Sequence, residues 1–436
     1  MSALQSHILD DVECLDGDGT RALQEKRLRI TLQRAHRSPL YGQRLSAILG
    51  FDATEESSAY QAFGIDDLER LPTTSKSDLR AVESIEDALA VPLNRIRRWH
   101  TSSGTTGRRT PMGYTAADLE TWGRLIRRNL AATGIGSGTR VHNAYGYGLF
   151  TGGLGFETGL AQAGATVLPA SSTPTVLEHL ELMREHRAQV LLSTPGLALA
   201  VTETVESDAS LRPPELRAGI FGGDGWSPVL RRRIESGLQI RAHDTYGLSE
   251  VLGPGVAHAC SERSNGLHLY SDAFLLEVLK PEDGLPLTPG TTGELVLTTL
   301  DHEASPRLRY RTGDRVAVDM TPCVCGRTTP RLTNIVRASD IRIYAGRALA
   351  PNDIEAALLG VDTAAGTFRI VAPEPEHDRL QLEVEPGIPE SGGFAEQVRR
   401  AVESRLDVPV SVRVLKSGTL TRSLGKRARL VEQPFS

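Results

Sequence analysis

Features that mark several common classes of protein are missing from this sequence. No uninterrupted apolar run approaches the roughly 20 residues that a membrane-spanning helix needs, and the polar, acidic start MSALQSHILDDVE lacks the hydrophobic region of a signal peptide. No basic block is longer than a few residues, and the formal net charge is −5, so nucleic-acid binding is not favoured. We therefore expect a cytoplasmic protein that acts away from membranes and nucleic acids.

Cysteine is also scarce, with four residues in a chain of 436. This content excludes a disulfide scaffold, and in a reducing compartment thiols or metal ligands are the commoner uses. Three of the four are Cys260, Cys323 and Cys325, and His268 stands nearby in the sequence. A Cys₃His set suits a structural zinc ion, because the protein would fill all four tetrahedral positions. His258 competes with His268 as fourth ligand, and plain buried thiols are the alternative to a metal.

The length allows a large core, and a prior of about 100–200 residues per domain predicts two or three units. Apolar and charged residues alternate at helical spacing over residues 1–90. Short strands separated by turn signals are expected from Asp272 to Val318, and a small α+β domain beyond Asp340. Four apolar segments alternate with helical ones and predict a parallel sheet: Arg140–Ala144, Thr166–Leu168, Gln189–Ser193 and Leu216–Phe221. We therefore expect an α/β fold with a β-rich subdomain and a small C-terminal α+β domain.

The most informative stretch is rich in hydroxyl groups. Five hydroxyl side chains and two glycines form the run Thr101, Ser102, Ser103, Gly104, Thr105, Thr106 and Gly107. Glycines let backbone N–H groups turn inward and hydroxyls add donors, so such a loop can wrap phosphate oxygens. It lacks the Gly-Lys-Ser/Thr of a P-loop and the Gly-x-Gly-x-x-Gly of a dinucleotide site. Taken alone, a loop of this composition is more often an ordinary polar surface loop.

Further motifs follow this hydroxyl loop in order along the chain. They are Tyr246-Gly-Leu-Ser-Glu250, Tyr310-Arg-Thr-Gly-Asp314, Arg337-Ala-Ser-Asp340 and Ser423-Leu-Gly-Lys426. With the segments NAYGYGLFTGGLG (143–155), FGGDGW (221–226) and CGRTTPR (325–331), the chain resembles the adenylate-forming superfamily and, within it, the phenylacetate–CoA ligases. The resemblance spans residues 95–430, which is most of the chain.

The resemblance implies a two-step reaction and a domain plan. ATP converts a carboxylate into an acyl adenylate with release of pyrophosphate, and the acyl group then passes by default to CoA. The plan places a helical N-terminal region at 1–90, an adenylate-forming core at 91–336, a hinge at 337–340 and a mobile C-terminal domain at 341–436. Closure about the hinge residues Arg337 and Asp340 would keep water from the adenylate.

The same resemblance assigns the residues that bind ATP. The hydroxyl loop would hold the β- and γ-phosphates, and Tyr246 would lie against adenine. Asp314 would accept hydrogen bonds from both ribose hydroxyls. The edge of the adenine would be lined by Gly222, Gly223 and Asp224.

Two residues are assigned to catalysis. Glu250 would bind Mg²⁺ through its carboxylate, because this cation prefers oxygen ligands. Lys426 would bridge the substrate carboxylate and the α-phosphate, and so stabilise the charge that develops at phosphorus. Considered without the motifs around them, a lone glutamate would be read as a surface or packing residue, and a lysine in a basic tail as part of a solvated terminus.

The acyl pocket is expected around the segment 143–155. Its aromatic and glycine residues could enclose a flat aromatic acid between rings and backbone, although core packing is the alternative for each ring. The candidates are Tyr145, Tyr147, Phe150, Gly152, Phe221 and Gly222. Because this region resembles aryl-acid activators, an aromatic carboxylate is the expected substrate.

Two stretches depart from the family pattern. Arg108-Arg109-Thr110 stands where relatives have Lys-Pro-Thr, and Gly346-Arg-Ala-Leu-Ala-Pro351 stands where phenylacetate–CoA ligases have Gly-Val-Asn-Val-Phe-Pro beside the pantetheine channel. The acceptor therefore stays open at this point: CoA by default, or a carrier-protein thiol, an amine or a second aromatic acid. A catalytically degenerate homologue that binds nucleotide or acyl ligand is the alternative from another class. The sequence also leaves open whether the chain forms a homodimer.

Overall fold

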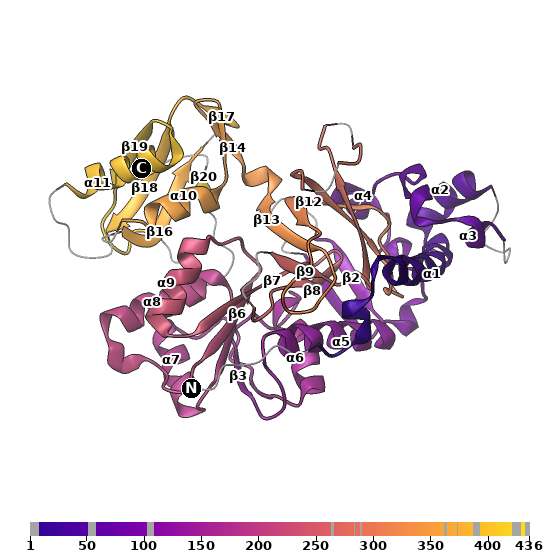
Figure 1. Cartoon of the computed structure of the whole chain (residues 1–436), viewed down its shortest axis with the longest axis horizontal. Coiled ribbons are helices and arrows are strands. Elements are labelled where there is room, and N and C mark those ends of the chain that lie inside the picture. Colours follow the sequence, from indigo (N-terminus) through magenta and orange to yellow (C-terminus); the bar gives the residue numbers. More distant parts are fainter. Residues whose placement is uncertain are drawn as a thin grey trace. The chain divides into compact units, whose positions relative to one another are not determined.

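The computed structural model describes residues 8–50, 58–102, 109–262, 266–282, 284–287, 290–361, 364–372, 374–386, 393–420 and 429–431. The chain divides into two compact units, and each unit combines two separate stretches of sequence (Figure 1). The first unit comprises Met1–Ser171 and His243–Ile335, and the second comprises Ser172–Ala242 and Val336–Ser436. Within the described ranges, none of the helices is both long and apolar enough to cross a membrane.

Helices dominate the first stretch of the first unit, as the helical spacing predicts. They are η1 (Asp11–Cys14), α1 (Gly17–His36), α2 (Pro39–Leu49), α3 (Ser58–Ala62), η2 (Ile65–Arg70), α4 (Lys76–Ala81), η3 (Glu86–Ala88), η4 (Leu93–Arg95), α5 (Ala116–Ala132) and α6 (Gly152–Ala163). Helix α4 begins after Ser75, which accepts a hydrogen bond from the N–H of Asp78, as expected of an N-cap serine. Buried side chains including Leu28, Leu32 and Leu308 join α1, α2, α3 and η2 into one core.

Strands of the first unit form two kinds of pairing. They are β1 (Arg98–Thr101), β2 (Pro111–Tyr114), β3 (Arg140–Asn143), β4 (Thr166–Leu168), β7 (Arg241–Leu248), β8 (Leu252–His258), β9 (Leu267–Leu269), β10 (Phe274–Leu279), β11 (Gly293–Thr299), β12 (Tyr310–Asp319) and β13 (Arg331–Arg337). Strands β3 and β4 pair in parallel, whereas β10, β11 and β12 pair antiparallel, as do β7, β8, β9 and β13 in that order.

The antiparallel strands begin earlier than the turn signals predict, at β7 instead of near Asp272. The reason is that every residue of β8 is buried, so this strand shows no alternation of polar and apolar residues that would mark it in the sequence. Between Tyr246 and Leu248 the register of β7 against β8 shifts. Gly247 lies at this shift, and a side chain there would meet the carbonyl oxygen of Leu252 at 2.8 Å.

The first stretch of the second unit contains a strand–helix–strand arrangement formed by β5, α8 and β6. Its elements are α7 (Val176–Glu185), β5 (Val190–Ser193), α8 (Pro195–Ser207), η5 (Ala209–Leu211), β6 (Ala218–Gly222) and α9 (Pro228–Leu238). Strands β5 and β6 pair in parallel and all their residues are buried, which explains their continuous apolar sequences. The sequence-based strand predictions for this stretch and for β3 and β4 are confirmed to within two residues at each end.

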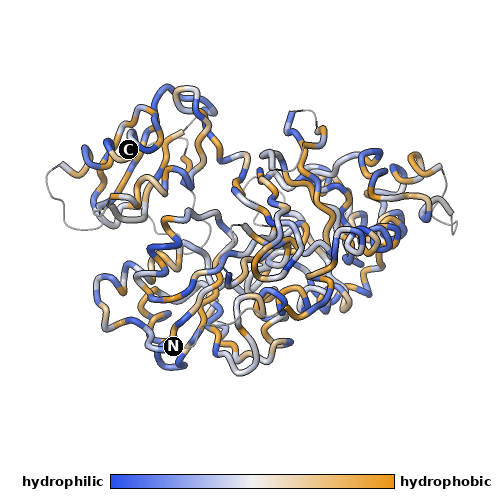
Figure 2. Tube along the Cα trace, viewed as in Figure 1, coloured by the Kyte–Doolittle hydropathy of each residue, from blue (hydrophilic) through white to orange (hydrophobic). Residues whose placement is uncertain are grey.

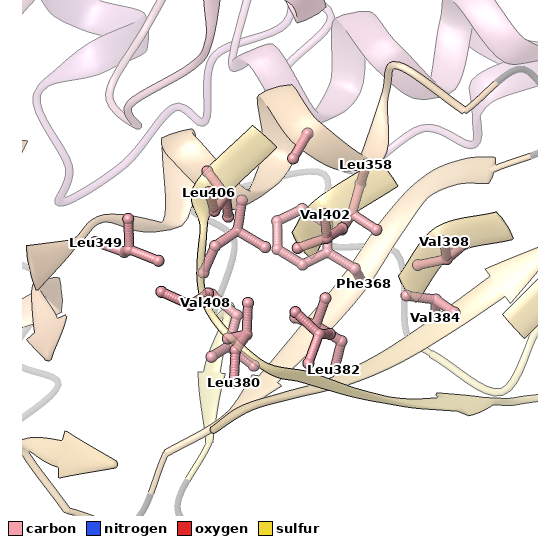
Figure 3. Close-up of a cluster of buried hydrophobic side chains, with 14 of the residues drawn as sticks. Leu349, Leu358, Phe368, Leu380, Leu382, Val384, Val398, Val402, Leu406 and Val408 are labelled. Carbon is pink, nitrogen blue, oxygen red and sulfur yellow. The ribbon is translucent and has the colours of Figure 1, made fainter. Parts of the chain in front are cut away.

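The C-terminal part of the second unit is a small α+β layer. Its elements are η6 (Ala338–Asp340), β14 (Arg342–Tyr344), β15 (Arg347–Leu349), α10 (Pro351–Leu358), β16 (Ala364–Val371), β17 (Glu376–His377), β18 (Leu380–Pro386), α11 (Phe394–Leu406), β19 (Val410–Val414) and β20 (Leu430–Val431). Four strands lie in the order β19-β18-β16-β20. Figure 3 shows the core between this sheet and the helices, where Phe368, Leu382 and Val402 are among the buried side chains. Along the trace in Figure 2, hydrophobic and hydrophilic stretches alternate in the helices of both units, as expected when one helix face packs on a core.

Candidate active site and metal centre

Strands β1 and β2 form the base of the hydroxyl loop. Thr101 pairs with Pro111 across the hairpin, and the Ser102 N–H donates to the carbonyl oxygen of Thr110 over 3.1 Å. Within the described ranges the buried hydroxyl of Thr101 has no hydrogen-bond partner. A buried polar group without a partner is a donor that a bound ligand can satisfy. The loop residues Ser103–Gly107 lie outside the described residues.

The aromatic segment 143–155 is joined to this hairpin. The Thr101 N–H donates to the carbonyl oxygen of Leu149 over 2.9 Å. Further along, the hydroxyl of Thr151 lies 3.4 Å from that of Ser249, within the Tyr246–Glu250 motif. The first unit therefore brings the base of the hydroxyl loop, the aromatic segment and the Tyr246–Glu250 motif into direct contact.

Not all the predicted pocket aromatics have the same environment. Tyr145 is buried and stacks on Phe156 with ring centroids 5.2 Å apart. A side chain at Gly152 would lie 3.2 Å from the Tyr145 ring, so glycine allows this approach. Tyr147 accepts a hydrogen bond from Asn143 over 2.9 Å, and burial and then the nearby carboxylate of Glu157 raise its pKa. By contrast, Phe150 is 49% exposed.

Tyr246 and Asp314 lie together although they belong to different motifs. The Tyr246 hydroxyl on β7 donates to Asp314 Oδ2 on β12 over 2.6 Å. The N–H of Asp314 donates to the hydroxyl of Thr312 over 3.1 Å, and the aspartate is 5% exposed. The bond from Tyr246 orients the carboxylate and the bond to Thr312 holds the backbone of Asp314, and a carboxylate held in this way suits an acceptor for sugar hydroxyls.

Two cations contact Glu250. Lys76 Nζ on α4 lies 2.7 Å from Glu250 Oε1, and the carboxylate side chain is only 8% exposed. From the other side, Arg307 Nε donates to the Glu250 carbonyl oxygen over 3.1 Å. Arg307 is fully buried and its other bonds go to the Pro306 carbonyl oxygen and the sulfur of Met112. The Glu250 carboxylate therefore already pairs with one cation, the Lys76 ammonium, and carboxylate oxygens are also the kind of ligand that Mg²⁺ prefers.

Sequence reasoning missed Lys76 and Arg307. Lys76 lies in the first turn of a helix whose pattern indicates only a surface helix, 174 positions before Glu250 (250 − 76). Arg307 lies between β11 and β12, outside every motif. No spacing rule links either residue to Glu250, because the contacts arise only from the tertiary fold.

Four other predicted residues lie in the second unit, at the end of β6 and in the loop that follows it. They are Phe221, Gly222, Gly223 and Asp224. Phe221 is buried and meets Trp226 edge-on, with ring centroids 5.6 Å apart. Gly223 has a φ of 82°, in the left-handed region that favours glycine.

The predicted hinge residues also belong to the second unit. Arg337 ends β13 and Asp340 ends the short helix η6. The hydroxyl of Ser339 donates to Asp340 Oδ1 over 3.2 Å. Lys426 lies outside the described residues.

The three predicted cysteine ligands and His268 form one cluster in the first unit. Their ligand atoms all lie within 4.8 Å of one another. Cys260 Sγ is 3.9 Å from Cys323 Sγ, and Cys325 Sγ is 3.5 Å from His268 Nε2. Tetrahedral zinc, with Zn–S of about 2.3 Å and Zn–N of about 2.05 Å, requires S···S of about 3.8 Å and S···N of about 3.6 Å. The donor set therefore has the spacing that zinc needs.

His268, and not His258, contacts the cysteines. Its Nδ1 lies 3.2 Å from the hydroxyl of Thr329, which orients Nε2 towards Cys325. His258 Nδ1 instead lies 2.9 Å from the carbonyl oxygen of Ala259, and its ring stacks on Tyr270 at 4.9 Å. Burial lowers the pKa of His258 well below its usual value. For Cys325, the hydrogen bond with Cys260 and then burial raise the pKa, and a bound cation would reverse this effect.

The loop 323–329, which holds two of the cysteine ligands and precedes β13, contacts the N-terminal segment around Glu13. Arg327 Nε lies 2.6 Å from Glu13 Oε2, and both side chains are 1% exposed. The N–H of Thr328 donates to the carbonyl oxygen of Glu13 over 3.1 Å. Cys14, the fourth cysteine, is exposed and its thiol lies 3.4 Å from the carbonyl oxygen of Gly326.

Comparison with known sequences defines the class of protein. The profile of the AMP-binding enzyme family matches residues 54–299, and that of the AMP-binding enzyme C-terminal domain matches residues 346–433. The fold and these matches are those of an adenylate-forming enzyme.

Relatives that align over nearly their full length show to which branch of this family the chain belongs. Phenylacetate-coenzyme A ligase of Thermus thermophilus is 36% identical over 445 residues, which cover 97% of this chain and 98% of that protein. The corresponding ligase of Escherichia coli is 36% identical over 443 residues and covers 97% of each chain. The chain therefore belongs to the phenylacetate–CoA ligase-like branch of the AMP-binding enzyme family. It is an AMP-forming acid–CoA ligase, which uses ATP to adenylate a carboxylic acid and then forms the CoA thioester.

Solved structures confirm the α/β fold with a large N-terminal and a smaller C-terminal part. A 2-hydroxyisobutyryl-CoA ligase in its postadenylation state, in complex with 2-HIB-AMP, aligns with a TM-score of 0.88 at 23% identity, over 97% of this chain and 91% of that one. An anthranilate CoA ligase in complex with anthranoyl-AMP aligns with a TM-score of 0.57 at 13% identity, over 73% and 63%.

Proposed function

We propose that this ligase activates an aromatic carboxylic acid and transfers it to CoA. The observation that carries the proposal is the hydrogen bond from the Thr101 N–H to the Leu149 carbonyl oxygen, at 2.9 Å. It joins the start of the phosphate-binding loop to the segment that holds Tyr145 and Tyr147. An acid held by these rings would therefore meet the phosphates of ATP. The relatives named as phenylacetate-coenzyme A ligases support an aromatic substrate.

The residues of the first unit have separate tasks in this proposal. Thr101 and its loop bind the phosphates, Asp314 binds the ribose, and Tyr246 lies against the adenine while it orients Asp314. Glu250 holds Mg²⁺, which supplies positive charge to the phosphates. Residues 222–224 would line the edge of the adenine, and Lys426 would stabilise the negative charge that develops as the carboxylate attacks the α-phosphate. Hinge motion at Arg337 and Asp340 then separates adenylation from thioester formation.

We propose a structural role for the Cys₃His cluster. Its four donors would fill the tetrahedral coordination of zinc and leave no position for a substrate. The proposal is supported by the S···S and S···N separations of 3.9 and 3.5 Å. The cluster would hold the loop 323–329 against β9 and the N-terminal segment.

The test of the substrate is carboxylate-dependent exchange of labelled pyrophosphate into ATP. We expect phenylacetate and benzoate analogues to support exchange, and aliphatic acids of similar size to be poor substrates. Mass analysis with CoA should then show the aryl-CoA thioester and AMP. A preference for aliphatic acids would overturn the aromatic proposal, and no product from any acid would favour the degenerate homologue.

The test of the catalytic lysine uses a matched control. Lys426→Ala should lower pyrophosphate exchange by about 100-fold or more, because one preorganised charge is worth that much in a transition state. Lys416→Ala, which removes an exposed lysine of the same domain, should leave the exchange unchanged. Equal activity of the two variants would exclude the assignment of Lys426.

A further inference from the structure

A buried asparagine ends strand β3, at the point where the aromatic segment 143–155 begins. Asn143 is 0% exposed. Strand β3 packs on helix α6, which starts at Gly152 near the other end of the segment (Figure 1). In α/β sheets, ligands commonly bind beyond the carboxyl ends of parallel strands, and Asn143 lies at this end of β3. The amide therefore lies at the edge of the sheet where a substrate is expected.

Both polar atoms of this amide are hydrogen-bonded, and the bonds reach three points of the aromatic segment. Nδ2 donates to the hydroxyl oxygen of Tyr147 over 2.9 Å and to the carbonyl oxygen of Gly153 over 3.1 Å. Oδ1 accepts from the backbone N–H of Tyr145 over 3.3 Å. A primary amide has only two N–H donors, and both are used. A substrate carboxylate, which only accepts hydrogen bonds, therefore finds no free donor on Asn143.

Tyr147 has a second side-chain partner, on α6. Its hydroxyl hydrogen-bonds with the carboxylate of Glu157, and burial and then this charge raise the pKa of the tyrosine. Because a carboxylate only accepts, the hydroxyl donates to Glu157 and accepts from Asn143. The hydroxyl is thus bonded to protein groups on both sides, and the ring keeps the direction that these bonds give it.

Tyr145 is also held on two sides. Its N–H donates to Asn143, and its ring stacks on Phe156 of α6 with centroids 5.2 Å apart. Gly152 allows the ring to lie close, because an added Cβ would be 3.2 Å from it. The two tyrosines proposed for the acyl pocket are therefore both bonded to the same buried amide.

We propose that Asn143 is a positioning residue for the acid, which holds the rings of Tyr145 and Tyr147 where the substrate ring binds. The inference rests on the proposed acyl pocket. A flat ring is recognised by its fit between side chains, so a displaced tyrosine weakens binding of the acid. The proposed ATP contacts at Tyr246 and Asp314 lie on β7 and β12, so ATP binding should not depend on the amide.

The test compares two Michaelis constants in pyrophosphate exchange with phenylacetate and ATP. Asn143→Ala removes all three bonds and should raise KM for phenylacetate by about 10- to 30-fold, since misplacement by about 1 Å has effects of this size or larger. KM for ATP should stay within about twofold, because only acid binding is changed. A residue that served stability alone would not produce this difference between the two substrates.

Tyr147→Phe removes one of the three bonds and keeps the ring, so it remains informative even if Asn143→Ala folds poorly. It should raise KM for phenylacetate by about 3- to 10-fold, the usual value of one hydrogen bond. Since the lost hydroxyl is bonded to Asn143 and Glu157, this rise reports the position of the ring. The double variant should be no more than about twofold worse than Asn143→Ala, because the two single changes break the same bond.

Gln24→Ala is the matched control. The Gln24 amide also donates two hydrogen bonds, to the carbonyl oxygens of Ser271 over 2.8 Å and of Phe274 over 3.3 Å, but it lies on α1. This variant should leave both Michaelis constants unchanged.

The positioning role would be overturned by equal rises in both Michaelis constants, by an Asn143→Ala enzyme with the KM of the control, or by losses that multiply in the double variant. Failure of the proposed function would look different. In that case the parent enzyme itself would prefer aliphatic acids or exchange no pyrophosphate.

Discussion

The Tyr246 hydroxyl donates a hydrogen bond to Asp314 Oδ2 over 2.6 Å, across 68 positions of sequence. Each residue belongs to its own motif, and neither motif by itself indicates that the two are partners. The bond makes the proposed adenine-binding ring and the proposed ribose acceptor a single rigid element. A hydrogen bond to an ionised group is also stronger than one between neutral groups.

Tyr246→Phe should therefore weaken ATP binding while the ring remains in place. Loss of a hydrogen bond to a charged group should lower kcat/KM for ATP by about tenfold. Pyrophosphate exchange at varied ATP concentration measures this ratio. The control is Tyr344→Phe, because among the described residues the hydroxyl of Tyr344 has no hydrogen-bond partner. Similar losses in both variants would contradict a specific role for the Tyr246 hydroxyl.

Lys76 should matter because it pairs with Glu250. Lys76→Met removes the ammonium at 2.7 Å and should lower kcat/KM for magnesium–ATP by about 3- to 10-fold, a modest effect because Lys76 is partly exposed. Lys76→Arg should retain most of the activity. Titration of the nucleotide with Mg²⁺ or Mn²⁺, followed by exchange and by binding, measures the effect. Lys26→Met on the exposed side of α1 is the control, and a Lys76→Met enzyme that behaves like it would show that Glu250 needs no cationic neighbour.

The zinc proposal predicts about one zinc ion per chain in protein purified without a histidine tag. Joint replacement of Cys323 and Cys325 by serine should abolish the metal and lower the unfolding temperature by about 5 °C or more, since metal binding contributes to folding. Cys14→Ser removes a cysteine outside the cluster and should retain the metal. Metal analysis and thermal unfolding are the measurements. Stoichiometric zinc in the double variant would refute the site.

The two histidine candidates can be distinguished in the same way. His268→Ala removes the nitrogen that lies 3.5 Å from Cys325 and should release the metal. His258→Gln should retain it, because this ring bonds to Ala259 and lies outside the cluster. The reverse pattern would assign the fourth ligand to His258.

His179 should make stability depend on pH. It is fully buried on α7, and burial lowers its pKa from 6.5. The unfolded chain therefore takes up a proton below about pH 6.5 that the folded chain does not bind, so the free energy of unfolding falls as the pH decreases. Below about pH 6.5 the residue should contribute at most about 1.4 kcal/mol per pH unit to this fall.

Denaturant unfolding at several pH values tests this. His179→Leu should show a smaller slope of unfolding free energy against pH than the parent. His186→Gln, which changes an exposed histidine directly after the same helix, should leave the slope unaltered. A slope that is the same for His179→Leu and the parent would show that His179 does not titrate on unfolding.

The sequence was sufficient for the family and for most elements, because these depend on local patterns. Thr166–Leu168, for example, was predicted with the bounds that β4 has, since a short apolar segment stands there between helical ones. The choice between His258 and His268 could not be made from spacing. It depends on β8 and β9, which place the two residues directly opposite each other and leave only His268 beside the cysteines.

Ion pairs between residues that are far apart in the sequence could not be predicted from the sequence. Arg429 lies in a basic run that indicates a solvated terminus, yet it is 6% exposed and pairs with Glu355, which is 74 positions away. Lys76 and Glu250 present the same difficulty. Opposite charges are frequent in any sequence, and only the packed fold selects which of them meet.

The contact between Glu13 and Arg327 has a consequence for how the chain is made. The two residues are 314 positions apart, so Glu13 leaves the ribosome long before its partner is synthesised. At about 5–20 residues per second, the wait lasts on the order of 15–60 seconds. During that time the carboxylate has the longer contact of 3.5 Å to Arg128, which is synthesised earlier, but not the 2.6 Å contact to Arg327, and a buried charge is costly unless it is well paired. The segment around Glu13 therefore gains its full set of buried contacts only when the second stretch of the first unit has been synthesised.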